Sequence, residues 1–255
     1  MRAMVRDDAV VEEVAGMRRV LDDAPLAWLS DVDWNGFDPS GWSDSTWVLH
    51  PMWVRRDHPL WASPDLTLEQ RDTMARQFTD TYAWHEPLGP DWTRLSWADF
   101  TERFDLASEF DRLGPAAFFG GKNVPAPGRY GIVGPGEGDL DPEVLGVLVR
   151  CLSEHSPDGA QTACYAYWDH VAVFWHVDSG RGKLFEGSLA AIPSLIGLET
   201  SQDPSPTNFW PIDRSWFVYS DPDSSATKVS GSASVINALR ACTHLETRDW
   251  SLDSE

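Results

Sequence analysis

The segment DVDWNGFDPSGW, residues 31–42, begins with the ligand spacing of a calcium-binding loop. Such loops place oxygen ligands at positions 1, 3 and 5, glycine at position 6 and a bidentate glutamate at position 12. The first four of these positions are filled by Asp31, Asp33, Asn35 and Gly36. Position 12 is Trp42, which offers no oxygen, so two ligands of the ion are lost at once. We therefore expect no calcium site here, and Asp31 and Asp33 are predicted to accept hydrogen bonds from nearby backbone amides.

Other residue types with catalytic or ligating chemistry lack the spacing that this chemistry needs. His170 and His176 fall in one expected strand, where six residues span roughly 20 Å, so they cannot share a metal ion by themselves. The segment GPGEGD, residues 134–139, has no lysine in place, and its carboxylates would repel a phosphate. Ser188 lacks the second glycine of a nucleophile elbow. The sequence predicts no catalytic residue, metal or cofactor, and a carboxylate pair among the 40 acidic residues stays open.

The charge of the chain is strongly negative along its whole length. Twenty basic residues stand against 40 acidic ones, and both halves of the chain carry the same excess of acid. A charge of this sign argues against DNA, RNA and anionic membranes as partners and leaves a basic protein or simple solubility. The three cysteines form no CxxC pair and no apolar export segment precedes them, which predicts reduced thiols in the cytoplasm.

Aromatic residues and acids concentrate in one interval that contains no lysine or arginine, residues 20–54. Nine of the 14 tryptophans lie between Trp28 and Trp97. Acids attract a basic partner at long range, and exposed indole rings hold it after contact. The predicted partner-binding residues are Asp31, Asp33, Trp34, Asp38, Trp42 and Asp44.

The order of the expected elements predicts an α+β fold with a helical, Trp-rich first half and an antiparallel sheet with packed helices in the second half. Apolar spacing predicts a helix over 8–21, and capping residues predict helices that begin after Thr67, Ser96, Asp141 and Ser232. Alternation predicts strands at 161–168, 170–177, 183–186, 215–220 and 226–230. The expected division is a helical region 1–123, a Gly/Pro linker 124–138 and a sheet region 139–255, which together can form one continuous domain. The expected core of the second half comprises Leu148, Leu152, Cys164, Ala166, Val171, Val173, Trp175, Phe217, Tyr219, Val235 and Leu239.

The carboxyl-terminal part of the chain carries a recognisable pattern. The run FWPIDRSWFVYSD, residues 209–221, is followed by TKVSGS, residues 227–232, and by an expected helix. This W-P-x-D-R-x-W signature resembles that of uncharacterised acidic bacterial proteins, over residues 160–246. Acidic proteins of this size are often immunity proteins that neutralise a toxin, and the resemblance implies an immunity-like role without implying any chemistry. The early tryptophan and Leu-Pro landmarks of SUKH-type immunity proteins do not align here.

Three functions fit these observations. The first is a protein-binding module that occludes a basic partner such as a toxin, because the charge would steer such a partner and aromatic rings would hold it. The second is a carbohydrate-binding protein or glycoside hydrolase, which needs tryptophan rings and a carboxylate pair in one cleft. The third is a structural subunit of a larger assembly, which a large exposed apolar patch would indicate.

Overall fold

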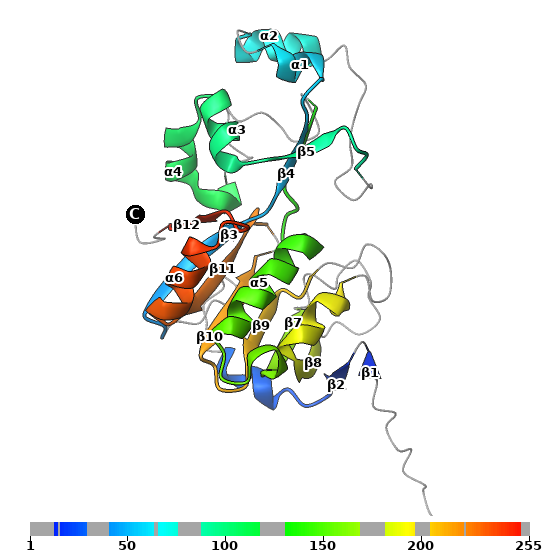
Figure 1. The fold of residues 1–255 in the computed structure, drawn as a ribbon, viewed down its shortest axis with the longest axis vertical. Coiled ribbons are helices and arrows are strands. Elements are labelled where there is room, and N and C mark those ends of the chain that lie inside the picture. The colour runs from blue at the N-terminus through cyan, green and yellow to red at the C-terminus, as the bar shows by residue number, and fades with distance from the viewer. Residues whose placement is uncertain are drawn as a thin grey trace, which may run out of the picture.

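The computed structural model describes residues 13–14, 16–29, 41–63, 66–75, 88–117, 131–168, 182–196, 205–221 and 223–250. In these ranges the chain forms two antiparallel sheets, a large one and a small one, placed one above the other along the long axis of the molecule (Figure 1). The two sheets are joined where β3 (Asp44–Leu49) of the large sheet runs on through His50 and Pro51 into β4 (Met52–Arg55) of the small one.

The large sheet contains nine strands within the described ranges, in the order β1-β2-β8-β7-β9-β10-β11-β3-β12. The strands not yet named are β1 (Glu13–Val14), β2 (Met17–Val20), β7 (Ala163–Trp168), β8 (Lys183–Ser188), β9 (Asn208–Pro211), β10 (Trp216–Ser220), β11 (Ala226–Gly231) and β12 (Thr247–Arg248). Side chains alternate between the two faces with a period of two. In β10, for example, Trp216 and Val218 join one cluster, whereas Phe217 and Tyr219 join another.

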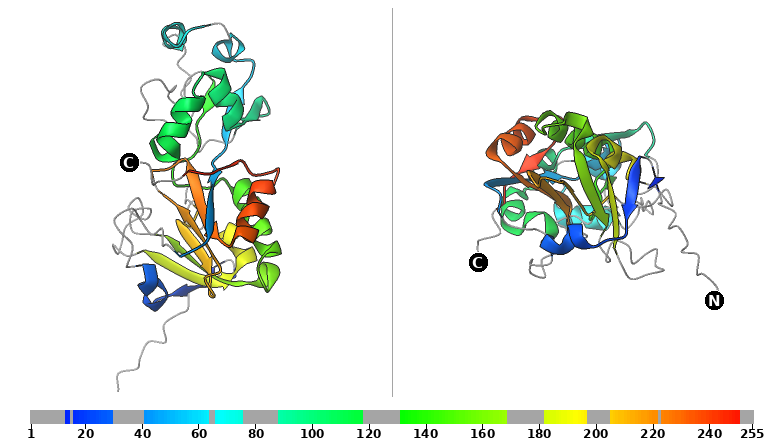
Figure 2. Two further views of the ribbon diagram at one scale, coloured as in Figure 1. Left: turned by 90° about the vertical axis from the view of Figure 1, so that its left-hand side faces the viewer. Right: turned by 90° about the horizontal axis from the view of Figure 1, so that it is seen from below.

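One face of the large sheet is covered by α5 (Pro142–Glu154) and α6 (Ala233–Ala241), which lie across it side by side, together with the 3-10 helix η5 (Leu189–Leu195) (Figures 1 and 2). Caps that the sequence predicts begin both α-helices. The Asp141 carboxylate accepts the N–H groups of Glu143 and Val144, and Ser232 accepts that of Val235. The core on this face is mainly aliphatic, and its predicted members Leu148 and Leu152 are fully buried. Of the other predicted core residues, those that the structure describes are buried too: Cys164, Ala166, Phe217, Tyr219, Val235 and Leu239.

The opposite face of the large sheet is aromatic. Tyr167, Trp210, Phe217 and Tyr219 are buried there, and the 3-10 helix η1 (Ala24–Leu29) packs on them through Leu29 and Trp28. Figure 2 shows η1 on the side of the sheet away from α5 and α6. The amino-terminal part of the chain therefore covers one end of this aromatic face.

The small sheet has the order β5-β4-β6 within the described residues, with β5 (Trp92–Leu95) and β6 (Ile132–Val133) on either side of β4. The helices beside it are α1 (Pro59–Ala62), α2 (Leu68–Ala75), α3 (Trp97–Arg103) and α4 (Ala107–Ala117) (Figure 1). Its core is built from large rings, such as Trp97 stacked on Phe110 with centroids 4.8 Å apart. The predicted caps are confirmed: Thr67 and Gln70 exchange two hydrogen bonds, and Ser96 accepts the Asp99 N–H.

The expectation of a helical, Trp-rich first half is wrong. The described residues are organised around two sheets, and strands β1 to β5 all come from the first half of the chain. The helix predicted over 8–21 is replaced, from residue 13 on, by a hairpin that turns at Gly16 with φ of +81°. Met17 packs over Gly187 of β8, and a Cβ atom added at Gly187 would lie 2.3 Å from the Met17 sulfur. Leu21, which the helix would place on the same apolar face as Met17, is 75% exposed. Pairing with β8 therefore decides the structure here, and the apolar spacing does not.

The large sheet takes β1, β2 and β3 from residues 13–49 and the remaining strands from residues 163–248. Within the segment 131–138, which the sequence assigns to a linker, Ile132 and Val133 pair with β4 and are buried. The expected strand at 170–177, with Val171, Val173 and Trp175, lies outside the described residues.

Candidate functional site

A pocket of about 300 Å³ opens beside the junction of the two sheets. It lies where the β3–β4 connection, the end of β6 and the start of α5 come together. Its walls include Pro51, Trp53, Val133, Gly136, Asp139 and Asp141. One wall is therefore an indole ring that is partly open to solvent, and another carries two carboxylates.

Acidic side chains continue outward from this pocket on two segments that are far apart in the sequence. The backbone N–H of Gly138 donates to the carbonyl of Ser224 over 2.9 Å, so the loop before α5 lies against the β10–β11 turn. We define the acidic rim as the carboxylates of these two segments: Glu137, Asp139, Asp141, Glu143, Asp221 and Asp223. No lysine or arginine lies in residues 131–149 or 215–227, so neither segment carries a cation near these carboxylates.

Hydrogen bonds hold the two carboxylates of the pocket in place. Asp139 Oδ1 accepts the Ser205 N–H over 2.7 Å, and burial raises the pKa of the Asp139 carboxyl, with a further contribution from the nearby Asp141 charge. Asp141 Oδ1 accepts two N–H groups at the start of α5. The pocket thus presents fixed negative charge, since both side chains are positioned before any ligand arrives.

A buried histidine, His50, contacts the backbone of Gly136 in the wall of the pocket. His50 Nδ1 contacts the Gly136 carbonyl, which can only accept, so Nδ1 carries the proton and Nε2 accepts from the Thr227 hydroxyl over 2.9 Å. Thr227 Oγ1 then accepts from Ser220 Oγ at 2.7 Å. Complete burial lowers the pKa of His50 to about 4, and the ring is neutral at pH 7. His50 is fully buried and positions Gly136 without reaching the pocket itself.

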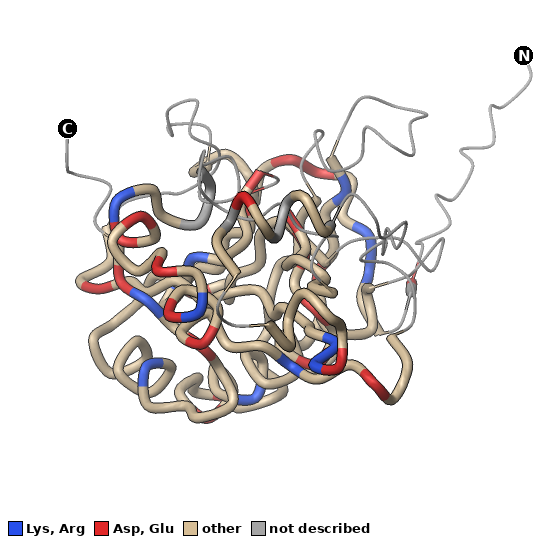
Figure 3. Tube along the Cα trace, turned by 90° about the horizontal axis from the view of Figure 1, so that it is seen from above, with Lys and Arg blue, Asp and Glu red and all other residues tan. Residues whose placement is uncertain are grey.

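Many of the basic side chains of the described chain are occupied within the molecule. Arg18 pairs with Glu186, Arg112 with Glu109, and Arg248 with Asp111. Arg103 lies over the ring of Trp61, and Arg214 over that of Trp28 at 4.6 Å. Figure 3 shows acidic positions over several parts of the described trace. These arginines are therefore engaged in contacts within the molecule, and acidic side chains in excess of them remain at the surface.

Four of the six residues predicted to bind a partner, Asp31, Asp33, Trp34 and Asp38, lie outside the described residues. Trp42 is half-buried on the aromatic face, where its ring stacks on Phe217 with centroids 5.6 Å apart. Its indole N–H donates to the Arg214 carbonyl over 3.1 Å. Trp42 therefore holds the amino-terminal part of the chain on the sheet and leaves part of its ring accessible.

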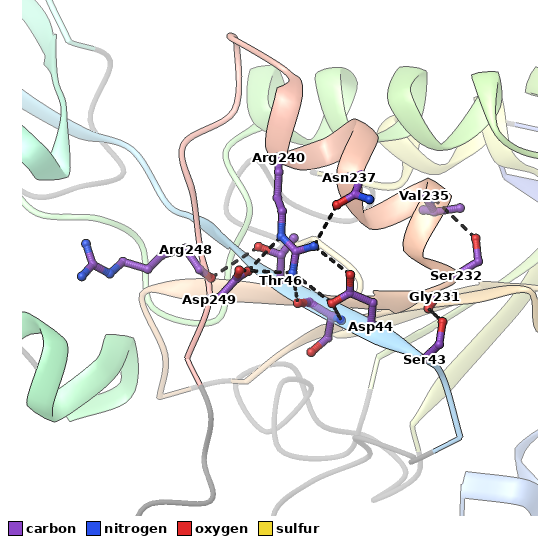
Figure 4. Close-up of polar contacts among 11 residues, drawn as sticks. Ser43, Asp44, Thr46, Gly231, Ser232, Val235, Asn237, Arg240, Arg248 and Asp249 are labelled. Carbon is purple, nitrogen blue, oxygen red and sulfur yellow. Dashed lines mark hydrogen bonds and ion pairs between the residues drawn. The ribbon is translucent and has the colours of Figure 1, made fainter.

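Asp44, the sixth predicted residue, forms an ion pair inside the molecule. The Arg240 guanidinium of α6 donates to both Asp44 oxygens, at 2.7 and 2.9 Å, and also pairs with Asp249 at 3.1 Å (Figure 4). Arg240 holds the pKa of Asp44 below its usual value. This carboxylate ties β3 to α6, and the structure does not place it with Trp42 in one open surface.

The W-P-x-D-R-x-W signature forms the turn between β9 and β10. Asp213 accepts the Ser215 N–H over 3.0 Å, and the Arg214 N–H donates to the Pro211 carbonyl over 2.9 Å. Arg214 has φ of +56°, a region that few residues other than glycine adopt. Its guanidinium then stacks on Trp28, and its carbonyl accepts from Trp42. The signature is thus a turn that fastens η1 and Trp42 to the end of the sheet.

Sequence reasoning missed the pocket and its rim. A usable signal was the run GEGDLDPE, residues 136–143, where alternate positions are acidic directly before a helix. Trp53, the last tryptophan of the interval without basic residues, was visible too, but its distance from that run in sequence gave no reason to join them.

The chain matches no known family model, and neither a curated protein nor a solved structure matches it significantly. In the described part of the chain, every helix is too short or too polar to cross a lipid bilayer.

Proposed function

We propose that this chain is a binding module for a basic protein partner, in the manner of an immunity protein, and that the pocket and its acidic rim make the central contact. The observation that carries this proposal is the placement of charge. Two carboxylates line a preformed pocket and others lie on the same segment and on the adjacent turn, with no lysine or arginine on these segments, while Arg240, Arg248 and other cations are engaged elsewhere.

The pocket has the chemistry that recognises a lysine or arginine side chain. The methylene groups of such a chain pack on Trp53 and Pro51, and its charged end meets Asp139 and Asp141. Because both carboxylates are already fixed by backbone N–H groups, little side-chain freedom is lost on binding. The outer rim attracts the partner before contact and raises the rate of association.

A glycoside hydrolase is the second candidate, and the pocket supplies its specific support. Trp53 and two carboxylates meet there, and the raised pKa of Asp139 suits a general acid. Hydrolysis of aryl glycosides, abolished by Asp139→Asn, would favour this candidate over a binding module.

The test of the proposal compares two variants of equal net charge. In the rim variant, exposed carboxylates beside the pocket are neutralised by Glu137→Gln, Glu143→Gln and Asp223→Asn. In the control, exposed carboxylates elsewhere are neutralised by Glu102→Gln, Asp105→Asn and Asp158→Asn. The probe is a fluorescent peptide with four arginines separated by Gly-Ser spacers, and its affinity is measured by fluorescence anisotropy at several salt concentrations.

We expect the rim variant to bind the peptide roughly tenfold more weakly than wild type and to show a flatter salt dependence. The control variant should stay within about twofold of wild type, because distant exposed charges are screened. Equal losses in the two variants would mean that only net charge matters and would refute a localised site.

A further inference from the structure

Two cysteines meet on the helix-covered side of the large sheet. Cys151 lies in α5, and Cys242 is the residue that follows α6. Their Sγ atoms are 3.4 Å apart, and both side chains are half-buried. The third cysteine, Cys164, is fully buried in β7, where its Sγ contacts the Thr162 carbonyl.

We propose that Cys151 and Cys242 form an oxidation site, at which a low-molecular-weight disulfide such as glutathione disulfide converts the two thiols into an intramolecular disulfide. This inference stands apart from the proposed function, because it uses neither the pocket nor the acidic rim.

The geometry requires only a small movement. A disulfide bond is roughly 2.05 Å long, so the two sulfur atoms must approach by about 1.4 Å. One partner sits at the end of α6, where the helical hydrogen bonding stops with Cys242 N–H donating to the Leu239 carbonyl. A cysteine at such an end can adjust its side chain without disturbing a helix interior.

The reaction proceeds by two thiol–disulfide exchanges. In the first, a protein thiolate attacks one sulfur of glutathione disulfide, forms a mixed disulfide and releases one glutathione thiolate. In the second, the other protein thiol loses its proton and attacks the protein sulfur of the mixed disulfide, which releases the second glutathione. Overall, two protein thiols are oxidised, one glutathione disulfide is reduced to two glutathione molecules, and both protons end on the released thiols.

The surroundings of the three cysteines predict different reactivities. Burial, followed by the contact with Cys242, raises the pKa of the Cys151 thiol. Either thiol of the pair can make the first exchange, and the other then resolves the mixed disulfide, because the two sulfur atoms are already in contact. Burial also raises the pKa of Cys164 to about 12, and this residue is shielded from solvent altogether, so it stays a thiol.

The cross-link would join α5 to the end of α6, two positions 91 residues apart in the sequence. A bond that closes so long a loop restricts the unfolded chain and stabilises the folded one. Oxidation is therefore expected to raise the melting temperature of the protein by several degrees, and reduction should reverse the change.

The experiment incubates the folded full-length protein with glutathione disulfide, then denatures it in iodoacetamide and measures its intact mass. The oxidised wild type should accept one alkyl group, at Cys164, where the reduced protein accepts three, and a digest should contain the linked Cys151 and Cys242 peptides. Cys164→Ala should still form the link, and Cys242→Ala should not. With Cys242→Ala, the increase in melting temperature should also be absent.

Three alkylated cysteines after incubation under conditions that oxidise dithiothreitol would overturn the proposal. Stable glutathione adducts on both Cys151 and Cys242, without a link between them, would overturn it as well, because the second exchange would then have failed.

Discussion

Two acidic, tryptophan-bearing regions of this molecule use the same residue types in opposite ways. In the large sheet, Asp44 of β3 is bound by Arg240, and Trp28 and Trp42, which cover the aromatic face, pack on Phe217 and Arg214. Around the pocket, Asp139 is held by Ser205 and Asp141 by two backbone N–H groups, and Trp53 borders open space. In the first region the Asp44 carboxylate is paired with an arginine and stabilises the fold, whereas in the second region the carboxylates have no arginine partner on their own segments and can meet a ligand.

The difference depends on where the arginines go. Arg240 stands in the last turn of α6, and the strand that it reaches, β3, is nearly 200 residues earlier in the chain, with a separation of 196 between Arg240 and Asp44. An interval without basic residues in the sequence can therefore be neutralised by a distant helix. A run of acidic residues in a sequence predicts an acidic surface only when no lysine or arginine from a distant part of the chain forms ion pairs with these residues.

The largest expected effect concerns the support beneath the pocket. The folded-state pKa of His50 is lowered to about 4, below its unfolded value of about 6.5, so the unfolded state binds the extra proton between these two pH values. Stability from this residue is complete above pH 6.5 and is lost as pH falls toward 4, by about 3 kcal/mol. Urea unfolding across this range should show the loss in wild type. This loss of stability in acid should be absent in His50→Gln, and it should be as large as in wild type in His244→Gln, an exposed control.

The next effect tests whether charge in the first region is structural. Arg240→Ala removes the bidentate pair with Asp44, the pair with Asp249 and the bond to the Ser45 carbonyl. We expect a loss of about 2 kcal/mol in the free energy of unfolding, because Asp44 is left partly buried without its cation. Arg150→Ala, on the exposed side of α5, should change stability by less than about 0.5 kcal/mol. Similar losses in the two variants would remove the contrast between the regions.

A smaller effect is expected for the other partner of this pair. Asp44→Asn keeps the shape of the side chain and lowers stability at pH 7 by about 1 kcal/mol, since one neutral oxygen replaces the carboxylate. Because the folded-state pKa of Asp44 is lowered, its contribution is present above pH 4 and is lost as pH falls through the folded-state value. The difference between wild type and variant should therefore shrink in acid. A difference that stays constant to pH 2 would show that the charge of Asp44 contributes nothing.

Local signals in the sequence predicted several helix starts and most of the strands of the second half. The caps at Ser96, Asp141 and Ser232 are formed as expected, because a capping hydrogen bond spans only two or three residues. Strands β7, β8, β10 and β11 form where the alternation predicted them, and successive side chains of β10 enter the clusters on opposite faces of the sheet. The Asp221 side chain accepts the Asp223 N–H in the turn, as its position before proline predicts.

The first half was misread for a physical reason as well. The apolar residues of 8–21 fit a helix, but Met17 and Val20 gain more from pairing with β8, which lies about 170 residues away, than from a local helix. The pocket escaped prediction in the same manner, because Trp53, Asp139 and the turn at Asp223 meet only after the two sheets have formed. Long-range pairing of this kind leaves no local pattern.

The most direct test of the account compares two tryptophans of the same sequence interval, Trp53 at the pocket and Trp42 on the aromatic face. Trp53→Ala and Trp42→Ala leave the net charge unchanged, so any difference in peptide affinity reports the location of the site. For the four-arginine peptide, we predict a roughly fivefold loss of affinity in Trp53→Ala, with the wild-type salt dependence retained, and no loss in Trp42→Ala. Wild-type affinity in Trp53→Ala together with weakened binding in Trp42→Ala would contradict the pocket and return the site to the aromatic face.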